Sequence, residues 1–529
     1  MDHNDSQHPH ERMRSEKKTE TRNSIIRLIF VLLAIVLQVW WFYFLLEKLA
    51  GVSSYVDQMI RLLSIAFALY VYGQHTNSAL KMPMIILILA YPIAGSIVFL
   101  AAGRKDSTRG ARQRFQRIDN ALIPRHPPKV KVLEKIRARD RGVGNIAGYL
   151  QTCCGFPVCG NSDVTYFDDP VPALKAQLEE LEKAEKFIFM EYHAVEDKES
   201  FAPIHDVLKR KAAQGLDVRL FYDDIGSIGF VDKAFVKKME ADGIKTRVFN
   251  PLIPMIIAFM NNRDHRKITV IDGKVAFTGG YNLANEYFHV TSPYGFWKDT
   301  GVMIRGDAVP SFTTMFVEMW NAIHPDDEDD KYYDAFYPKV TYQARKEAGF
   351  VQPYCDSPLD DERVGENVYM DICDQAKNYC WFITPYLIIT DEMSRTLTNA
   401  AKRGVDVRII TPGVPDKKLV YLTTRSYYPQ LARAGVRIFE YTPGFCHAKM
   451  CVSDDVCATC GTINLDFRSL YHHFENGVFL AFDPAVLAIR NDFKTMFPQC
   501  REVTQKAKGR RSIPKRVFQC VLRLFASLE

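Results

Sequence analysis

The sequence predicts an α/β protein with two repeated lobes, each built around a mixed β-sheet, preceded by transmembrane helices. Three observations predict this architecture. One eight-residue motif occurs twice, apolar strand-like runs alternate with helical stretches in the same order around each copy, and the first hundred residues contain long apolar runs. Apolar strands that alternate with helices are typical of βαβ units with a buried sheet.

The repeated motif has the form H-x-K-x-x-x-x-D. It supplies the candidate catalytic residues His265, Lys267 and Asp272 in the first copy and His447, Lys449 and Asp454 in the second. An asparagine follows each histidine at the same distance, Asn282 and Asn464. A single copy should arise by composition in roughly one chain in twenty of this length, so one copy is a weak signal. Two copies with matching downstream residues are not a chance result.

Sequence alternation predicts that each motif is a strand with its histidine and lysine on one face, followed by a turn at the aspartate. Strand-like runs before the motifs also repeat, at 184–192 and 376–385, at 215–224 and 404–412, and at 243–249 and 435–441. We therefore place the first lobe at residues 151–335 and the second at 336–500. A pseudo-twofold arrangement would bring both motifs to the interface between the lobes.

Two histidines, two lysines and two asparagines around one space suit a phosphodiester substrate. Fixed ammonium and amide groups, the latter from Asn282 and Asn464, stabilise charge on the phosphate oxygens in the transition state. One imidazole can attack phosphorus while the other protonates the leaving oxygen. No metal or other cofactor is required. Each motif aspartate could instead hold its own turn, and Asp299 and Glu475, downstream of the motifs, are our candidates for orienting the imidazoles.

The paired motifs resemble those of the phospholipase D superfamily, and the surrounding residues resemble bacterial cardiolipin synthases. The resemblance is carried by residues 191–192, 222–227, 384–388, 411–418, 441–449, 461–470 and 473–478, within a similarity that runs from about Leu28 to Phe497. Cys446 departs from it, standing where an aliphatic residue is expected. The resemblance implies two phospholipase D-like lobes that transfer a phosphatidyl group from one phosphatidylglycerol to another through a phosphatidyl-histidine. It further implies that His265 attacks and His447 protonates.

Composition and cysteine usage fit globular lobes with a membrane anchor. The chain has 47% hydrophobic and 25% charged residues and a formal charge of +6. The 12 cysteines are scattered, and the cluster Cys446, Cys451, Cys457 and Cys460 lacks the spacing of a zinc site. We expect reduced core thiols in a reducing compartment.

The amino-terminal region predicts a bacterial plasma-membrane protein with cytoplasmic lobes. Residues 1–27 form a polar tail, which we expect to be disordered and cytoplasmic, and 28–103 form the anchor. Spans are expected at about 28–46 and 84–102, because about twenty apolar residues cross a bilayer. The segment 55–72 is expected to be interfacial or a third span. Basic flanks on both sides favour two crossings.

Two further basic segments flank the lobes. Residues 104–150 are expected to be a linker that lies against anionic headgroups. Residues 501–529 are a basic amphipathic tail, either an interfacial helix or a packed terminal helix.

Several other functions stay open. Lipid hydrolysis, or transfer to a different acceptor such as ethanolamine or serine, would use the same residues. A nuclease is disfavoured because no basic groove interleaved with aromatics is evident, so we expect no nucleic-acid partner. A non-catalytic membrane scaffold would not need two complete motifs. The oligomeric state is not indicated.

Overall fold

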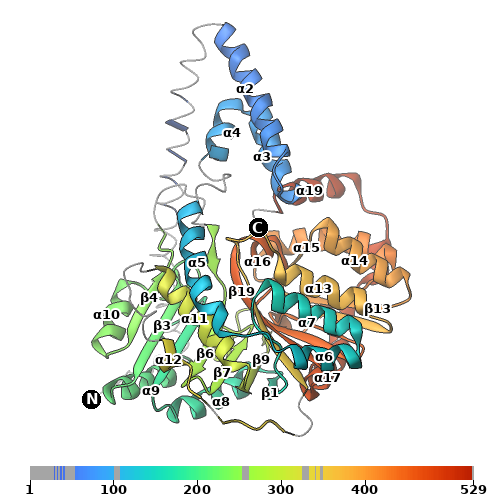
Figure 1. Cartoon of the computed structure of the whole chain (residues 1–529). Helices are drawn as coiled ribbons and strands as arrows, with labels where there is room; N and C mark the ends of the chain where they lie inside the picture. Colours follow the sequence, from blue (N-terminus) through green and yellow to red (C-terminus); the bar gives the residue numbers. More distant parts are fainter. Residues whose placement is uncertain are drawn as a thin grey trace, which may run out of the picture.

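The structure is a computed structural model, and it describes residues 54–100, 108–252, 261–323, 333–339, 341–345 and 349–526, with isolated positions between 29 and 44 (Figure 1). The predicted tail 1–27 and most of the predicted span 28–46 lie outside the described residues. The predicted α/β architecture with two lobes and two mixed sheets is confirmed.

The first lobe is built around a seven-stranded mixed sheet with the order β1-β9-β7-β6-β2-β3-β4. Strands β2, β3 and β4, which run from the middle of the sheet to one edge, are parallel to one another, and the other neighbours pair antiparallel. The strands are β1 (Ser162–Phe167), β2 (Phe187–Tyr192), β3 (Asp217–Asp223), β4 (Lys245–Phe249), β6 (Lys267–Ile271), β7 (Val275–Gly279) and β9 (Gly301–Gly306). The helices are α8 (Pro170–Glu182), α9 (Ala202–Ala213), α10 (Lys233–Ala241), α11 (Val309–Ile323) and α12 (Tyr333–Phe336).

The second lobe repeats this order as β10-β19-β17-β16-β11-β13-β14 and adds β20 at one edge. Strands β11, β13 and β14 are parallel, as their counterparts are. The strands are β10 (Phe350–Asp356), β11 (Tyr379–Ile383), β13 (Asp406–Pro412), β14 (Arg437–Tyr441), β16 (Met450–Ser453), β17 (Cys457–Gly461), β19 (His473–Ala481) and β20 (Cys500–Glu502). The helices are α13 (Val364–Gln375), α14 (Asp391–Lys402), α15 (Lys418–Ala434), α16 (Phe467–Tyr471), α17 (Pro484–Met496) and α18 (Thr504–Lys508).

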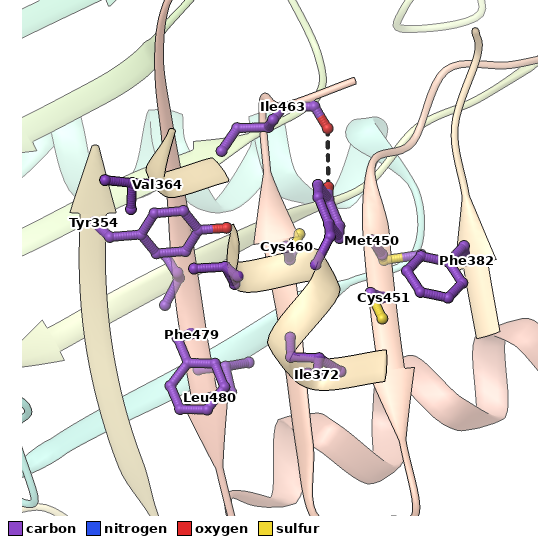
Figure 2. Close-up of a cluster of buried hydrophobic side chains, with 14 of the residues drawn as sticks. Tyr354, Val364, Ile372, Phe382, Met450, Cys451, Cys460, Ile463, Phe479 and Leu480 are labelled. Atoms are coloured by element: carbon purple, nitrogen blue, oxygen red, sulfur yellow. Dashed lines mark hydrogen bonds between the residues drawn. The ribbon is translucent and has the colours of Figure 1, made fainter. Parts of the chain in front are cut away.

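One hydrophobic core joins the two lobes. Helix α11 contacts β6 and β2 of the first sheet and β10 of the second, and nearly all of its residues are buried. In the second lobe, Figure 2 shows Ile372 of α13 beside Met450, Cys451 and Cys460 of the central strands. The four clustered cysteines of the sequence, Cys446, Cys451, Cys457 and Cys460, are buried free thiols, as expected of core cysteines.

The segment that was predicted to be a linker, 104–150, folds differently in the part that the structure describes. It forms α5 (Arg109–Leu122), a 3-10 turn (Ile123–Arg125), α6 (Val130–Arg139) and α7 (Arg141–Cys153). Their apolar residues belong to the main core, and Phe115 of α5 stacks on Phe474 of β19 at 4.9 Å between ring centroids. The high density of Arg and Lys obscured this apolar face, because most of the cationic residues lie on the exposed sides of the helices. The described part of this segment is therefore a set of packed helices and not an irregular linker, whereas its contact with anionic headgroups stays a prediction.

The amino-terminal helices extend from one end of the molecule (Figure 1). They are α2 (Ser54–Tyr72), α3 (Ser78–Ala90) and α4 (Pro92–Val98). The predicted continuous span 84–102 is instead broken at Tyr91, whose non-helical backbone (φ −131°, ψ 77°) ends α3. Pro92 explains the break, because a residue before proline avoids the helical conformation. Among the described helices, none has both the length and the apolar character needed to cross a membrane.

The carboxyl-terminal tail contains α19 (Ile513–Leu524), which contacts α15 of the second lobe and α3. Of the two alternatives for this tail, packing against the lobe is therefore present.

Candidate active site

Two short sheets that cross between the lobes hold the motif histidines. Strand β5 (Arg263–Asp264) pairs with β19, and β8 (Phe296–Lys298) pairs with β15 (Gly444–Cys446). Directly after these pairings, the His265 N–H donates to the Phe474 carbonyl at 2.9 Å and the His447 N–H donates to the Lys298 carbonyl at 2.7 Å. Each histidine is thus fixed by backbone of the opposite lobe.

The histidine side chains are also oriented from the opposite lobe. His265 Nδ1 lies 2.8 Å from Glu475 Oε1, and His447 Nδ1 lies 2.6 Å from Asp299 Oδ2. Both carboxylates are fully buried. Because each carboxylate accepts from Nδ1, each imidazole is left with its Nε2 available for chemistry.

The motif lysines lie beside the histidines. Lys267 Nζ donates to the His265 carbonyl at 2.6 Å, and Lys449 Nζ donates to the His447 carbonyl and lies 2.7 Å from His447 Nδ1. Burial, with Lys449 nearby, lowers the pKa of Lys267 to about 7, against the opposing effect of Glu475. Burial lowers the pKa of Lys449 to about 8, with Asp299 and Glu475 opposing.

The surroundings of both histidines favour the neutral imidazole. Burial and the Lys449 ammonium lower the pKa of His447 to about 4, although Asp299 opposes this. Burial and the surrounding cations, Lys267 first, hold the pKa of His265 well below its usual value. Burial raises the pKa of Asp299, but Lys449 and His447 outweigh it and keep that pKa below its ordinary value. The pocket thus holds ionised Asp299 next to a concentration of positive charge, which favours an anionic substrate.

The two motif asparagines are in the same pocket but are held differently. Asn282 accepts from the Ala194 N–H at 3.1 Å and donates to the Tyr287 hydroxyl at 2.8 Å. The carbonyl oxygen of Asn464 is buried and without a hydrogen-bond partner among the described residues.

The two motif aspartates do not reach the pocket, which corrects their assignment to the catalytic set. Asp272 accepts from the N–H groups of Glu185, Lys186 and Phe187 at 2.7–2.9 Å. Asp454 does the same for residues 377–379. Both have positive φ of 53° at the hairpin turn. Since the intervening strand of about five residues is about 16 Å long, they act at the far end of the hairpin, where they tie it to the neighbouring strand.

The histidines open into one cavity of about 610 Å³ between the lobes. Its walls include Asn282, Asn464 and several residues that sequence reasoning did not assign to the site, among them His193, Tyr287, Trp297, Lys417, Arg468 and His473. His193 comes directly after β2, at the carboxyl end of a parallel strand, where binding residues gather in α/β sheets. This position in the sequence could have indicated His193 as a site residue. His473 could have been indicated by its location two residues before Glu475, which was already a candidate.

One group in the site has ligand atoms close enough to hold a metal ion. In the part of the chain that is described, the only such group is His265, His473 and Glu475, whose ligand atoms lie within 4.8 Å of one another. Glu475 also accepts hydrogen bonds from the Thr462 and Ser469 hydroxyls.

The comparisons with known proteins agree with this geometry. Residues 178–320 and 369–497 match the family model of the cardiolipin synthase, PLD-like domain. An uncharacterized protein from Streptococcus mutans serotype c is 39% identical over 464 residues, which are 88% of this chain and 100% of the relative. A cardiolipin synthase from Geobacillus kaustophilus is 30% identical over 468 residues, 88% of this chain and 92% of the relative.

A solved structure supports the fold. The crystal structure of phosphatidylserine synthase from Haemophilus influenzae Rd KW20 aligns with a TM-score of 0.53 at 14% identity, covering 73% of this chain and 97% of that one. The matched segments cover both lobes, and they agree with the duplicated sheet and with the histidine–carboxylate pairs that cross between the lobes. This chain therefore belongs to the cardiolipin synthase family of phospholipase D-like (PLD-like) proteins.

Proposed function

We propose that this protein is a cardiolipin synthase that transfers a phosphatidyl group from one phosphatidylglycerol to another, giving cardiolipin and glycerol. The observation that carries this proposal is the pair of buried imidazoles at one cavity, each oriented by a carboxylate of the other lobe. Such a pair can supply a nucleophile and a proton donor to a single phosphorus atom.

In the first half-reaction, His265 Nε2 attacks phosphorus of the donor lipid. The P–N bond forms, and the bond from phosphorus to the headgroup glycerol oxygen breaks. His447, which takes up a proton from solvent when the anionic phosphodiester binds beside it, gives that proton to the leaving oxygen. Glycerol leaves, and the phosphatidyl group stays on His265. Asp299 supports this division of roles, because its negative charge and hydrogen bond raise the pKa of His447 in opposition to burial and Lys449, whereas burial and the charges around His265 lower the pKa of that histidine well below its usual value.

In the second half-reaction, a glycerol hydroxyl of another phosphatidylglycerol attacks the same phosphorus. His447 accepts the hydroxyl proton, the new P–O bond forms, and the P–N bond to His265 breaks. Lys267 and Lys449, with Asn282 and Asn464, stabilise the charge on the non-bridging oxygens in both steps. All of these groups are protein side chains, so no cofactor enters the scheme.

The substrate and the location are supported by the relatives and the sequence. A cardiolipin synthase is 30% identical along most of its length, and the apolar residues at 28–46 provide a segment for membrane attachment. We propose that the protein works at the bacterial plasma membrane with its lobes on the cytoplasmic side and with phosphatidylglycerol as its lipid partner.

The test is to supply the purified, detergent-solubilised full chain with phosphatidylglycerol alone and to quantify the products. We expect cardiolipin and free glycerol in equal amounts. Phosphatidic acid and glycerol would instead indicate hydrolysis, and a product that appears only with added ethanolamine or serine would indicate another acceptor.

A second measurement tests the intermediate. Rapid quench with labelled phosphatidylglycerol, followed by peptide mapping under alkaline conditions, should place the label on His265. Label on His447 would reverse the two roles, and the absence of an adduct in both peptides would favour direct transfer between lipids.

A further inference from the structure

Helix α19 exposes its apolar residues instead of burying them. Ile513, Val517, Phe518, Val521 and Phe525, at its end, are 48–74% exposed, whereas the polar Gln519 is 6% exposed. With 3.6 residues per turn, Gln519 lies nearly opposite Val517 and Val521 on the helix. The helix is therefore attached by a polar side and shows its apolar side to the surroundings.

The contacts of α19 explain this orientation. The Arg523 guanidinium lies 4.4 Å from the ring centroid of Tyr427 on α15, and Arg511 donates to the side-chain oxygen of Gln519. The helix also contacts α3, and Ala526, just beyond it, enters the main core. These polar and cation–π contacts hold the helix in place without covering the apolar side chains.

Uncompensated positive charge borders the apolar face. Lys515 and Arg516 are exposed on α19, and Arg433 of α15 lies near Arg511. Burial and repulsion from Arg433, Arg516 and Arg523 lower the pKa of Arg511. Within the described residues, none of these basic groups forms an ion pair with a carboxylate. An apolar strip flanked by basic residues is the pattern of a helix that lies in an anionic membrane surface.

This face is connected to the mouth of the active-site cavity by α15. Lys417 and Val420, at the start of α15, line the cavity, and Leu419 and Leu422 beside them are exposed. The amino-terminal helices meet the same region, because Asn77 donates to the Tyr471 hydroxyl at 3.1 Å and to Glu392 at 3.2 Å. Figure 1 shows α19 between the base of α3 and the top of α15.

We propose that the exposed face of α19 binds the surface of a bilayer that contains anionic phospholipid and thereby holds the mouth of the cavity at the lipid–water interface. The basic border selects the anionic bilayer over a second copy of the chain, because a copy related by twofold symmetry would bring the same arginines together. This inference deepens the proposed function, since it gives lipid substrates a short path to the histidines. The binding itself does not depend on which lipid product is formed.

The experiment uses the full chain in lipid nanodiscs, with an environment-sensitive dye on Cys520, which is exposed on α19. Cys153, the other exposed cysteine, is replaced by serine, and a protein that also carries Cys520→Ser gives the background. Phosphatidylserine serves as the anionic lipid, so that the proposed substrate is not needed, and brominated lipids report insertion. We expect a blue shift and at least twofold stronger quenching in discs with phosphatidylserine than in discs of phosphatidylcholine alone.

Two sets of variants locate the effect. Val517→Asp with Val521→Asp should abolish the quenching, and Lys515→Gln with Arg516→Gln should weaken it and reduce its salt dependence. Leu487→Asp on α17 is a matched control, since Leu487 is 40% exposed and α17 lies at the opposite end of the molecule. It should leave the quenching unchanged.

The possible outcomes separate this inference from the proposed function. Equal quenching in the Val517/Val521 variant, or none in any anionic disc, would overturn it, as would Cys520 cross-links between copies that account for the dye shift. The labelled His265→Ala protein should be quenched like the parent, because binding precedes chemistry. If the parent protein makes no cardiolipin but is quenched, only the proposed function fails.

Discussion

The two halves of the active site share their catalytic groups but differ in the walls around them. His265 faces the imidazoles of His193 and His473, with ring centroids 4.9 and 5.3 Å away. His447 instead faces the rings of Tyr287 at 5.3 Å and Trp297 at 5.4 Å. His473 and Trp297 are equivalent positions, each two residues before the orienting carboxylate.

The same contrast holds two residues before each histidine. Arg263 precedes His265 and Phe445 precedes His447, and these residues pair across the lobes with His473 and Trp297. The repeat therefore conserves the groups that would act on phosphorus and varies the groups that would contact the rest of the substrate. One wall of the cavity is polar and titratable, and the other is aromatic.

The largest expected effect comes from the two histidines, the catalytic groups that both halves of the site share. His265→Ala and His447→Ala should each lower the rate of cardiolipin formation by about 10⁴-fold or more, because both imidazoles act on one phosphorus. Turnover of labelled phosphatidylglycerol gives the rate. His289→Ala, a histidine outside the cavity, is the matched control and should stay near the parent rate. A highly active His447→Ala protein would show that the halves are not equivalent in chemistry.

The next effect concerns the lysines. Lys267→Ala or Lys449→Ala should lower the maximal rate by about 10²–10³-fold, since each removes one donor to the transition state. Lys274→Ala, which removes an exposed lysine paired with Glu185, should change little. If the lysine variants show a raised KM with an unchanged kcat, the lysines only bind substrate.

A third test addresses how each carboxylate is supported. Thr462 donates to Glu475, whereas the equivalent Gly280 leaves room for Asp299. A Cβ at Gly280 would stand 2.0 Å from Asp299 Oδ1, so Gly280→Ala must displace the carboxylate and tilt His447. A misplacement of about 1 Å costs about 10²-fold in rate. Gly229→Ala, where a Cβ meets no atom within 4 Å, is the control, and parent-like kcat in Gly280→Ala would contradict the role of Asp299.

The duplicated motif predicted the two lobes and the shared cavity, because short motifs with matching surroundings indicate a repeated supersecondary unit. The residues downstream of each motif supplied the carboxylates Asp299 and Glu475 as candidates. The differing walls were not predictable. Trp297 reaches the cavity through pairing of strands from different lobes, which no local pattern encodes. The helices of 104–150 were missed because basic residues dominate their composition, and the role of the motif aspartates was misassigned because a motif does not show which end of its strand faces the substrate.

The pH dependence should reflect the lysines on the alkaline side. As the pH rises through about 7 and about 8, Lys267 and Lys449 lose their protons in the free enzyme, so kcat/KM should fall roughly tenfold per unit between these values and roughly a hundredfold per unit above both. The acid limb should lie well below pH 6.5, where His265 becomes protonated and can no longer attack. Lys267→Arg should move the alkaline limb upward, and chelator should leave the profile unchanged. An alkaline limb that stays in place in the arginine variant would assign it to another group.

The smallest effects should come from the walls themselves, and they distinguish the two halves most directly. Replacing Trp297 by Phe keeps an aromatic surface beside His447 but removes part of its area, and aromatic contacts of this kind are worth about 0.5–1.5 kcal/mol, or about 2- to 10-fold. Because Trp297 contacts His447 through its ring and its indole N–H does not act as an acid or base, we expect a higher KM for phosphatidylglycerol with little change in kcat. His473→Gln should act differently, because His473 Nδ1 lies 3.5 Å from Glu475, which orients His265. Its loss should appear in kcat and in the acid limb of the pH profile. Equal changes in the same kinetic constant for both variants would mean that the polar and aromatic walls serve one purpose, and the contrast between the two halves would then have no bearing on function.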